Sequence, residues 1–336
     1  MPMSLTLRAT LIALGAALVL AFSFVQTMGE GSVATSTLDA LRHMFVDDGA
    51  QAGFVVRELR LPRALVAILV GASLAMAGLI IQTVLRNPLG DPGLMGVSSG
   101  AAFAVASVMA LVSSDTALLM PAGIAGGLFA AAITLLLARR SGFAPLQLTL
   151  AGMAVSIFFM AAISATMVLN RTAIQTLYFW LIGGFMNRTW IEVFFTWPWV
   201  AGGLVVGVLL GRRLDILQFE DAVSRSLGAN AVLWRLGFVL IAVVLTAASV
   251  AAAGPLGFVG FAVPHLTRWL LGRAGANAGH GLLLPLVALN GAALTLATDA
   301  FARSGIWNKQ MPAGILTTLF GGALLLLFLR QMRRTA

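Results

Sequence analysis

Long stretches without a charged residue constrain this chain more than any other feature of its sequence. A helix needs about 20 mostly apolar residues to cross a lipid bilayer. The window 236–267 is too long for one span and contains Gly254, Pro255 and Gly257, which are unfavourable in a helix interior. Division of this window near residue 254 predicts ten transmembrane helices in total. The charge-free windows are 9–29, 64–85, 92–114, 116–138, 141–170, 193–211, 236–267, 274–298 and 310–329.

The composition supports an all-α polytopic membrane protein with one transmembrane domain over residues 1–336. Only 10% of the residues are charged and 60% are hydrophobic, whereas about a quarter of a soluble domain is charged. The net charge of +9 does not indicate nucleic-acid binding, because the arginines lie singly or in pairs between apolar stretches. We interpret the first window as an uncleaved helix, because it is long and no small-residue cleavage site precedes Gly29.

The distribution of arginine and lysine predicts the orientation. With ten spans and a cytoplasmic N-terminus, thirteen of the 21 basic residues fall on the cytoplasmic side and eight on the outer side. Four of those eight lie in the segment 30–63, which is too polar for lipid. We therefore expect a periplasmic segment 30–63 that contains a short amphipathic helix, and we expect both termini to be cytoplasmic.

The chain lacks the motifs of an enzyme. It has no cysteine, no phosphate-binding loop and no histidine pair at helical spacing, so we predict no catalytic residue, no metal site and no cofactor bound by this chain. Ion-coupled transporters usually keep charged groups near the bilayer midplane, and the windows contain no aspartate, glutamate, lysine or arginine. Asp299, near the end of the ninth predicted helix, is the nearest exception, and we expect it to pair with Arg303 four residues on.

This absence of intramembrane charge favours a driving force that a partner protein applies. An ion-coupled secondary transporter or channel without an ATPase remains an alternative, because neutral polar groups can also bind sodium. A membrane scaffold or assembly factor is the third interpretation.

Four motifs occur in order along the chain, and together they resemble the permease family of ATP-binding-cassette (ABC) importers for ferric siderophores, haem and cobalamin. The resemblance covers about residue 57 to the end. The chain departs from the family in two places, since Gln310 stands near Pro312 where a glutamate is common, and Ala323 follows Gly322 where a proline is common. The motifs are Arg60-Leu61-Pro62-Arg63 with Gly71, Gly78, Gln82 and Arg86-Asn87-Pro88-Leu89-Gly90-Asp91; Leu150-Ala151-Gly152 with Trp180-Leu181-Ile182-Gly183-Gly184; Gly254-Pro255-Leu256-Gly257-Phe258-Val259-Gly260 with Pro264-His265; and Asp299 to Arg303 with Met311-Pro312-Ala313-Gly314.

The resemblance implies a multi-pass protein of the bacterial inner membrane that works as a homodimer, with the translocation path between the two copies. It also implies two cytoplasmic ATPase subunits, which use ATP and Mg²⁺, and a periplasmic substrate-binding protein. Ferric siderophore is the expected cargo, with haem and cobalamin as alternatives.

The resemblance also implies three functional regions. Arg60, Arg63 and Arg303 are expected to dock the binding protein, although Arg60 and Arg63 could instead anchor a helix start to lipid headgroups. Pro145 and Leu146 lie at the inner mouth, where the family has its cytoplasmic gate.

The third region is a coupling segment, residues 212–235, that is expected to sit in a cleft of the ATPase. It contains a short predicted helix with Val223 and Leu227 on one face, ended by Gly228. A helix lying on the membrane surface is the alternative. The coupling residues expected are Glu220, Asp221, Val223, Arg225, Leu227 and Gly228.

The remaining motif residues are interpreted as structural. Proline moves the preceding residue away from helical geometry, so Asn87-Pro88 is expected to end a helix. We expect His265 to be buried and hydrogen-bonded and not to bind a metal. The structural residues predicted are Gln82, Asn87, Pro88, Gly257, Gly260, Pro264 and His265.

Overall fold

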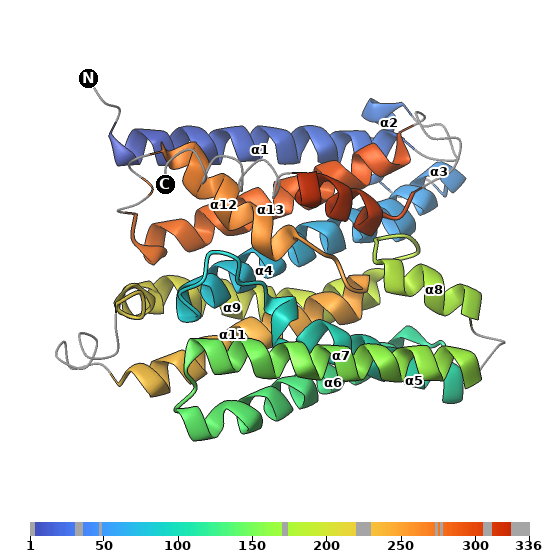
Figure 1. Cartoon of the computed structure of the whole chain (residues 1–336). Helices are drawn as coiled ribbons and strands as arrows, with labels where there is room; N and C mark the ends of the chain where they lie inside the picture. The colour runs from blue at the N-terminus through green and yellow to red at the C-terminus, as the bar shows by residue number, and fades with distance from the viewer. Residues whose placement is uncertain are drawn as a thin grey trace.

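The computed structural model describes residues 4–30, 36–46, 49–169, 174–219, 230–272, 275, 278–304 and 311–323. Every regular element within these ranges is helical, which confirms the predicted all-α class, and the long helices lie side by side in one bundle (Figure 1). Among the residues that the structure describes, seven helical stretches are long and apolar enough to cross a membrane. They are α1 (Leu5–Gly29), the rod Gln51–Val84, α6 (Thr116–Ala138) with η3 (Arg139–Ser141), α7 (Pro145–Leu169), α9 (Trp190–Ile216), α11 (Ala231–Ala253) and α13 (His280–Arg303).

Shorter helices complete the described part of the bundle. Two of them, α5 (Val97–Leu111) and the helix Ala313–Ala323, fall within predicted windows. A third, α12 (Val259–Leu271), begins in the window 236–267 and ends four residues beyond it. The predicted division of the window 236–267 is confirmed, because α11 ends at Ala253 and Gly254 has a φ of +72°. The remaining short elements are α2 (Thr37–His43), α8 (Ile174–Ile182) and η2 (Pro92–Met95).

The rod Gln51–Val84 begins thirteen residues before the predicted window 64–85. It consists of α3 (Gln51–Phe54), the π-helical η1 (Val55–Arg60) and α4 (Leu61–Val84). The rod continues through Pro62, the second residue of α4, which has no backbone N–H to donate and directly follows the π-helical turn η1.

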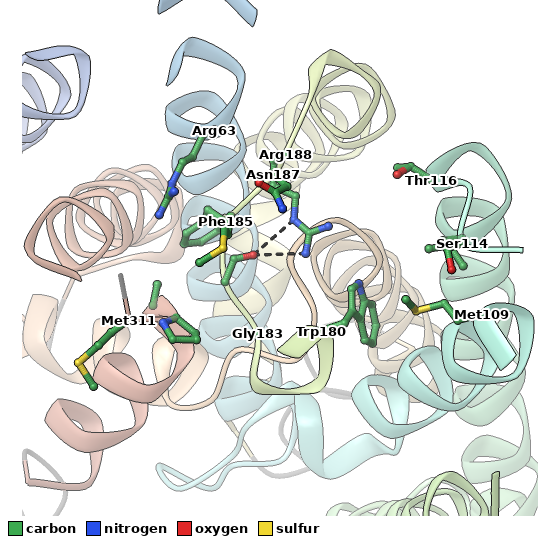
Figure 2. Close-up of a pocket in the computed structure, with 15 residues that line it drawn as sticks. Arg63, Met109, Ser114, Thr116, Trp180, Gly183, Phe185, Asn187, Arg188 and Met311 are labelled. Atoms are coloured by element: carbon green, nitrogen blue, oxygen red, sulfur yellow. Dashed lines mark hydrogen bonds between the residues drawn. The ribbon is translucent and has the colours of Figure 1, made fainter. Parts of the chain in front are cut away.

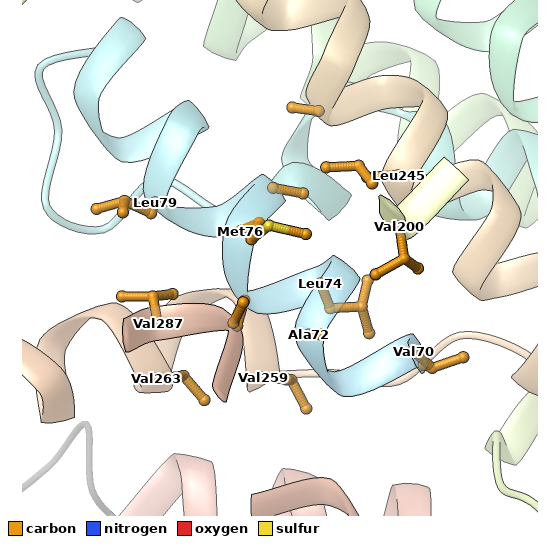
Figure 3. Close-up of a cluster of buried hydrophobic side chains, with 14 of the residues drawn as sticks. Val70, Ala72, Leu74, Met76, Leu79, Val200, Leu245, Val259, Val263 and Val287 are labelled. Atoms are coloured by element: carbon orange, nitrogen blue, oxygen red, sulfur yellow. The ribbon is translucent and has the colours of Figure 1, made fainter. Parts of the chain in front are cut away.

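Helix α4 forms the centre of the bundle. It is buried along most of its length and packs against α9, α11, α12 and α13. Figure 3 shows Met76 and Leu79 of α4 among side chains from these neighbours, such as Leu245 and Val287. A helix that contacts protein on all sides can be apolar all round, which explains why α4 has no polar face.

Several outer helices expose large apolar side chains. Leu18 of α1, Phe129 of α6, Ile157 of α7 and Leu209 of α9 each have more than 60% of their surface exposed. Soluble monomers rarely present such surfaces to water, so these faces suit contact with lipid or with another membrane subunit.

The segment after α4 differs from the prediction. The window 92–114 was expected to form one span, but α5 starts only at Val97, after the short helix η2. This segment folds back into the bundle, because Thr134 of α6 donates to the Met95 carbonyl (3.0 Å) and Ser156 of α7 donates to the Gly93 carbonyl (3.4 Å). Charge-free sequence does not distinguish such a re-entrant segment from a full helix.

The helix ends gather at two opposite ends of the bundle. At one end the Arg8 guanidinium donates to the Leu271 carbonyl (2.9 Å), and at the other the Trp190 indole donates to the Arg57 carbonyl (3.2 Å). Figure 1 shows α2, α3 and α8 at the end away from the start of α1. We call the α8 end the predicted outer end and the opposite end the predicted cytoplasmic end, since the membrane orientation itself stays a prediction.

Candidate functional site

A cavity of about 770 Å³ opens at the predicted outer end, and we call it the Arg63–Arg188 cavity (Figure 2). Its wall combines residues from α4, α5, α6 and α8 with the segments 183–188 and 311–313. Figure 2 shows Met109 and Met311 on opposite sides of it. The lining residues are Arg63, Met109, Ser114, Thr116, Leu119, Trp180, Gly183, Gly184, Phe185, Met186, Asn187, Arg188, Met311, Pro312 and Ala313.

Three of the sequence motifs meet at the floor of this cavity. The Gly184 N–H donates to the Ala253 carbonyl (2.8 Å), and the Gly314 N–H donates to the Gly183 carbonyl (3.1 Å). Glycine is required at Gly183 by its φ of +78° and at Gly314 by a close approach, since a Cβ there would lie 2.0 Å from the Ile182 oxygen. These glycines therefore allow the segment after α8 to pack closely against the non-helical segment that follows α11.

Arg63 reaches the cavity from α4 and forms a bidentate ion pair with Asp299 of α13. Its Nε and Nη2 lie 2.9 and 2.8 Å from the two carboxylate oxygens. The predicted local pair between Asp299 and Arg303 is therefore wrong. The planar guanidinium of Arg63 matches both carboxylate oxygens at once, whereas Arg303 turns toward the end of α1 and donates to the carbonyls of Thr27 and Glu30.

Arg188 forms the second cationic part of the wall. Its Nε and Nη2 both lie 3.4 Å from the Gly184 carbonyl oxygen, and its Nη1 lies 3.6 Å from Glu192. Dashed lines in Figure 2 mark the two bonds from Arg188 to the carbonyl. Glu192 also accepts from the backbone and hydroxyl of Thr189 (2.8 Å each) and so caps α9. Desolvation by burial lowers the pKa of the Arg188 guanidinium, while the Glu192 charge acts in the opposite direction.

The cavity wall is cationic even though each arginine has an acidic partner. The carboxylates of Asp299 and Glu192 are 0% and 1% exposed, whereas the side chains of Arg63 and Arg188 are 10% and 15% exposed. The arginines thus lie between the buried carboxylates and the cavity, and no carboxylate is among its described lining residues. An anionic group entering the cavity would meet guanidinium donors and the edges of Trp180 and the methionines.

The three predicted docking residues lie close together at the predicted outer end, but their side chains are largely inside the protein. Arg60 is 3% exposed and donates to the carbonyls of Met28 and Gly29, and Arg303 is half-buried. Their guanidinium groups therefore tie α1 to the rod and to α13. Docking of a binding protein by this trio stays a prediction.

The predicted gate residues lie at the predicted cytoplasmic end, where Pro145 and Leu146 begin α7. Leu146 is 65% exposed. The turn before them is fastened by Arg235, a 1% exposed residue of α11 that donates to the Phe143 carbonyl (3.3 Å). The gate role stays a prediction. Gln310 and the predicted coupling residues Glu220, Asp221, Val223, Arg225, Leu227 and Gly228 lie outside the described residues.

The residues interpreted as structural connect α4, the segment after it and α12. Gln82 donates to the Phe261 carbonyl (3.2 Å) and accepts from Arg268 (3.1 Å), while the His265 Nε2 lies 2.6 Å from the Pro88 carbonyl. His265 is 5% exposed, so its expected burial is observed.

The other structural residues shape the same region. The Asn87 side chain accepts from the Leu89 N–H (2.9 Å) after α4 has ended, and Gly260 lets α12 approach the rod, since a Cβ there would lie 3.1 Å from the Leu74 oxygen. Pro264 lies inside α12, and Gly257 lies in the break before it.

Two groups of polar residues were missed from the sequence. Arg188 lies four residues after Gly184 of the Gly183-Gly184 motif, so its neighbourhood gave a signal that could have identified it. The second group joins Asp215 and His280, which are 65 residues apart, and no local spacing indicates their contact (2.5 Å). Among the described residues, no group of three or more histidine, aspartate or glutamate side chains could hold a metal ion.

Comparison with known proteins finds membrane permeases of similar sequence along most of the chain. The chain is 34% identical over 319 residues to the Fe(3+)-citrate import system permease protein YfmD of Bacillus subtilis, covering 95% of this chain and 94% of the relative. It is 35% identical over 304 residues to the hemin transport system permease protein HmuU of Yersinia pestis, covering 88% and 86%.

A solved structure has the same fold. It is an inward-facing conformation of a putative metal-chelate type ABC transporter, with a TM-score of 0.84 and 30% identity over 95% of this chain and 99% of the other. The model of the FecCD transport family matches residues 18–331. The chain is a multi-pass membrane permease and belongs to the FecCD transport family.

Proposed function

We propose that this protein is the membrane-spanning subunit of an ABC importer that moves an iron chelate into a bacterial cell. A ferric siderophore or ferric citrate is the favoured cargo, and haem or cobalamin is the alternative. The proposal includes ten transmembrane helices in the inner membrane, cytoplasmic termini, a second copy of the chain, two ATPase subunits and a periplasmic binding protein. Membership of the FecCD family and the names of the relatives support it.

The observation that carries the cargo assignment is the cationic lining of the Arg63–Arg188 cavity. Ferric chelates built from carboxylate or catecholate groups, and haem with its two propionates, present anionic oxygens on a large apolar or metal-bound body. Guanidinium groups bind such oxygens with paired N–H donors. An anion bound beside Arg188 would also offset the free-energy cost of burying the positive charge of its guanidinium group. The cavity is therefore proposed as the first contact of the cargo with the permease.

The test uses the permease reconstituted in vesicles with its ATPase and its binding protein, and measures uptake of radioactive iron as ferric citrate. Arg188→Gln should lower the uptake rate about tenfold, as expected when a charge-assisted hydrogen bond of about 1.5–3 kcal/mol is lost. Arg188→Lys should retain more uptake because it keeps the charge. Arg42→Gln is the matched control, since Arg42 is an exposed arginine of α2 outside the cavity.

Equal uptake by the Arg188→Gln and Arg42→Gln proteins would refute the role of the cavity. Thermal unfolding of each variant in detergent separates this effect from damage to the cap of α9. Uptake that persists without any ATPase, driven by an ion gradient, would instead support the secondary-transporter alternative.

A further inference from the structure

The predicted cytoplasmic end of α9 is held by a cluster of polar side chains that the proposed cargo path does not use. Asp215, in the last turn of α9, accepts from both the backbone N–H (2.9 Å) and the Nδ1 (2.5 Å) of His280, the first residue of α13. The other ring nitrogen of His280 lies 2.8 Å from the hydroxyl of Thr83 in α4. Two residues beyond Asp215, the Leu217 carbonyl accepts from Arg86 (3.0 Å).

Both ring nitrogens of His280 have a hydrogen-bond partner. The Thr83 hydroxyl lies within hydrogen-bond distance of the His280 Nε2 (2.8 Å) and of the Leu79 carbonyl (2.9 Å), one turn back in α4. The His280 Nδ1 lies 2.5 Å from the carboxylate of Asp215, and the Gln218 amide lies farther away from it (3.4 Å). One side of the imidazole is therefore bonded to α9 and the other to α4.

Two of the three side chains in the cluster are buried. His280 is 1% exposed and Thr83 is 5% exposed, whereas the Asp215 side chain is 32% exposed. A hydrogen bond between a buried side chain and a carboxylate is costly to break, because the groups left behind lose their partners away from water. The cluster thus joins α4, α9 and α13 into one unit at the point where α9 ends.

We infer that His280, Asp215 and Thr83 are positioning residues that couple ATP hydrolysis to transport. Along the chain, Asp215 lies five residues before Glu220, where the coupling residues predicted from the sequence begin. Helix α9 also packs against α4 and α13 along its length, and the cluster adds a polar connection to both helices close to the end at which the ATPase would apply a force. α4 and α13 also hold Arg63 and Asp299 at the opposite end of the bundle, so the two helices joined by the cluster continue to the proposed cargo cavity. This inference rests on the proposed function.

The decisive variants change one hydroxyl group. Thr83→Val keeps the shape of the side chain and removes the hydroxyl that is hydrogen-bonded to His280, whereas Thr83→Ser keeps the hydroxyl. Thr246→Val is the matched control, because Thr246 is also a buried helix residue whose hydroxyl donates to a carbonyl one turn back (Ala242, 2.7 Å). His280→Gln and Asp215→Asn break the same cluster from its other two members.

The experiment measures iron-chelate uptake and ATP hydrolysis together, in vesicles that contain the permease, its ATPase and its binding protein. Thr83→Val, His280→Gln and Asp215→Asn should each lower the number of chelates imported per ATP about tenfold, within the usual range of coupling between sites, while hydrolysis continues. Thr83→Ser and Thr246→Val should keep the ratio of the unmodified protein. A variant that merely folded poorly would lose uptake and stimulated hydrolysis together.

One result is that the unmodified protein transports normally and the Thr83→Val and His280→Gln proteins import the same number of chelates per ATP as it does. This result would overturn the inference and leave the proposed function standing. Absence of uptake dependent on the binding protein in the unmodified protein would overturn the proposed function and the inference with it. A double-mutant cycle tests the contact itself, since Thr83→Val and His280→Gln should affect the melting temperature non-additively, whereas Thr246→Val and His280→Gln should be additive.

Discussion

At the scale of single residues, the buried ion pair between Arg63 and Asp299 shows how long-range geometry overrides local spacing. The helical spacing of Asp299 and Arg303 favours a pair worth a few tenths of a kcal/mol on an exposed surface. Asp299 is fully buried, and a buried carboxylate requires a partner that satisfies both oxygens. Arg63, 236 residues away in the sequence, supplies two donors in one plane.

Replacement of Asp299 by asparagine should therefore destabilise the protein, because Arg63 would keep a buried charge without an ionised partner. We expect a loss of about 3–5 kcal/mol in the free energy of unfolding, measured as a lower melting temperature in detergent. The double variant Arg63→Gln with Asp299→Asn should recover part of the loss. Asp115→Asn is the control, because Asp115 caps α6 at the surface and asparagine caps helices equally well. Equal melting temperatures for the Asp299→Asn and Asp115→Asn proteins would contradict this account.

At the scale of helices, close crossings between glycines hold the central helix in place. A Cβ on Gly78 of α4 would lie 1.8 Å from the Gly260 oxygen of α12, and a Cβ on Gly71 would lie 2.4 Å from the Gly291 oxygen of α13. Small residues allow such contacts between membrane helices, where dispersion forces and packing drive association.

Substitution of Gly78 by alanine should force α4 and α12 apart. Overpacking of this kind costs about 1–3 kcal/mol, so the melting temperature in detergent should fall. Gly15→Ala in α1 is the matched control, because no atom lies within 4 Å of the added methyl group, and alanine favours a helix by about 1 kcal/mol over glycine. A Gly78→Ala protein as stable as the Gly15→Ala protein would show that α4 and α12 have room for an added methyl group at this crossing.

The helices were predictable from the sequence to the extent that charge and proline mark their ends. Arg139 and Arg140 follow α6, and Gly254 and Pro255 separate α11 from α12, as predicted. The re-entrant segment before α5 was not predictable, because its backbone is satisfied by side chains from α6 and α7 that only the fold brings near. The His280 cluster and the cavity were not predictable for the same reason, because their residues come from distant parts of the chain.

At the scale of the whole molecule, the two ends of the bundle differ in a way that bears on its orientation. The end that holds the Arg63–Arg188 cavity also holds α2 and the cap of α9, whereas the opposite end holds the starts of α1, α7 and α13 (Figure 1). The thirteen-to-eight bias of basic residues predicts that the second end faces the cytoplasm. Delivery of cargo by a periplasmic protein requires the cavity to face outward.

The absence of cysteine from the chain allows a direct measurement of this orientation. Met186 lies on the cavity wall and is 39% exposed, and Leu146 lies in the first turn of α7 and is 65% exposed. A membrane-impermeant maleimide should label Met186→Cys in intact spheroplasts and Leu146→Cys only in inverted membrane vesicles, because each thiol is accessible from one side alone. The unmodified protein, which has no thiol, is the background control. The reverse labelling pattern would place the cavity in the cytoplasm, and a cavity there could not receive cargo from an outer binding protein.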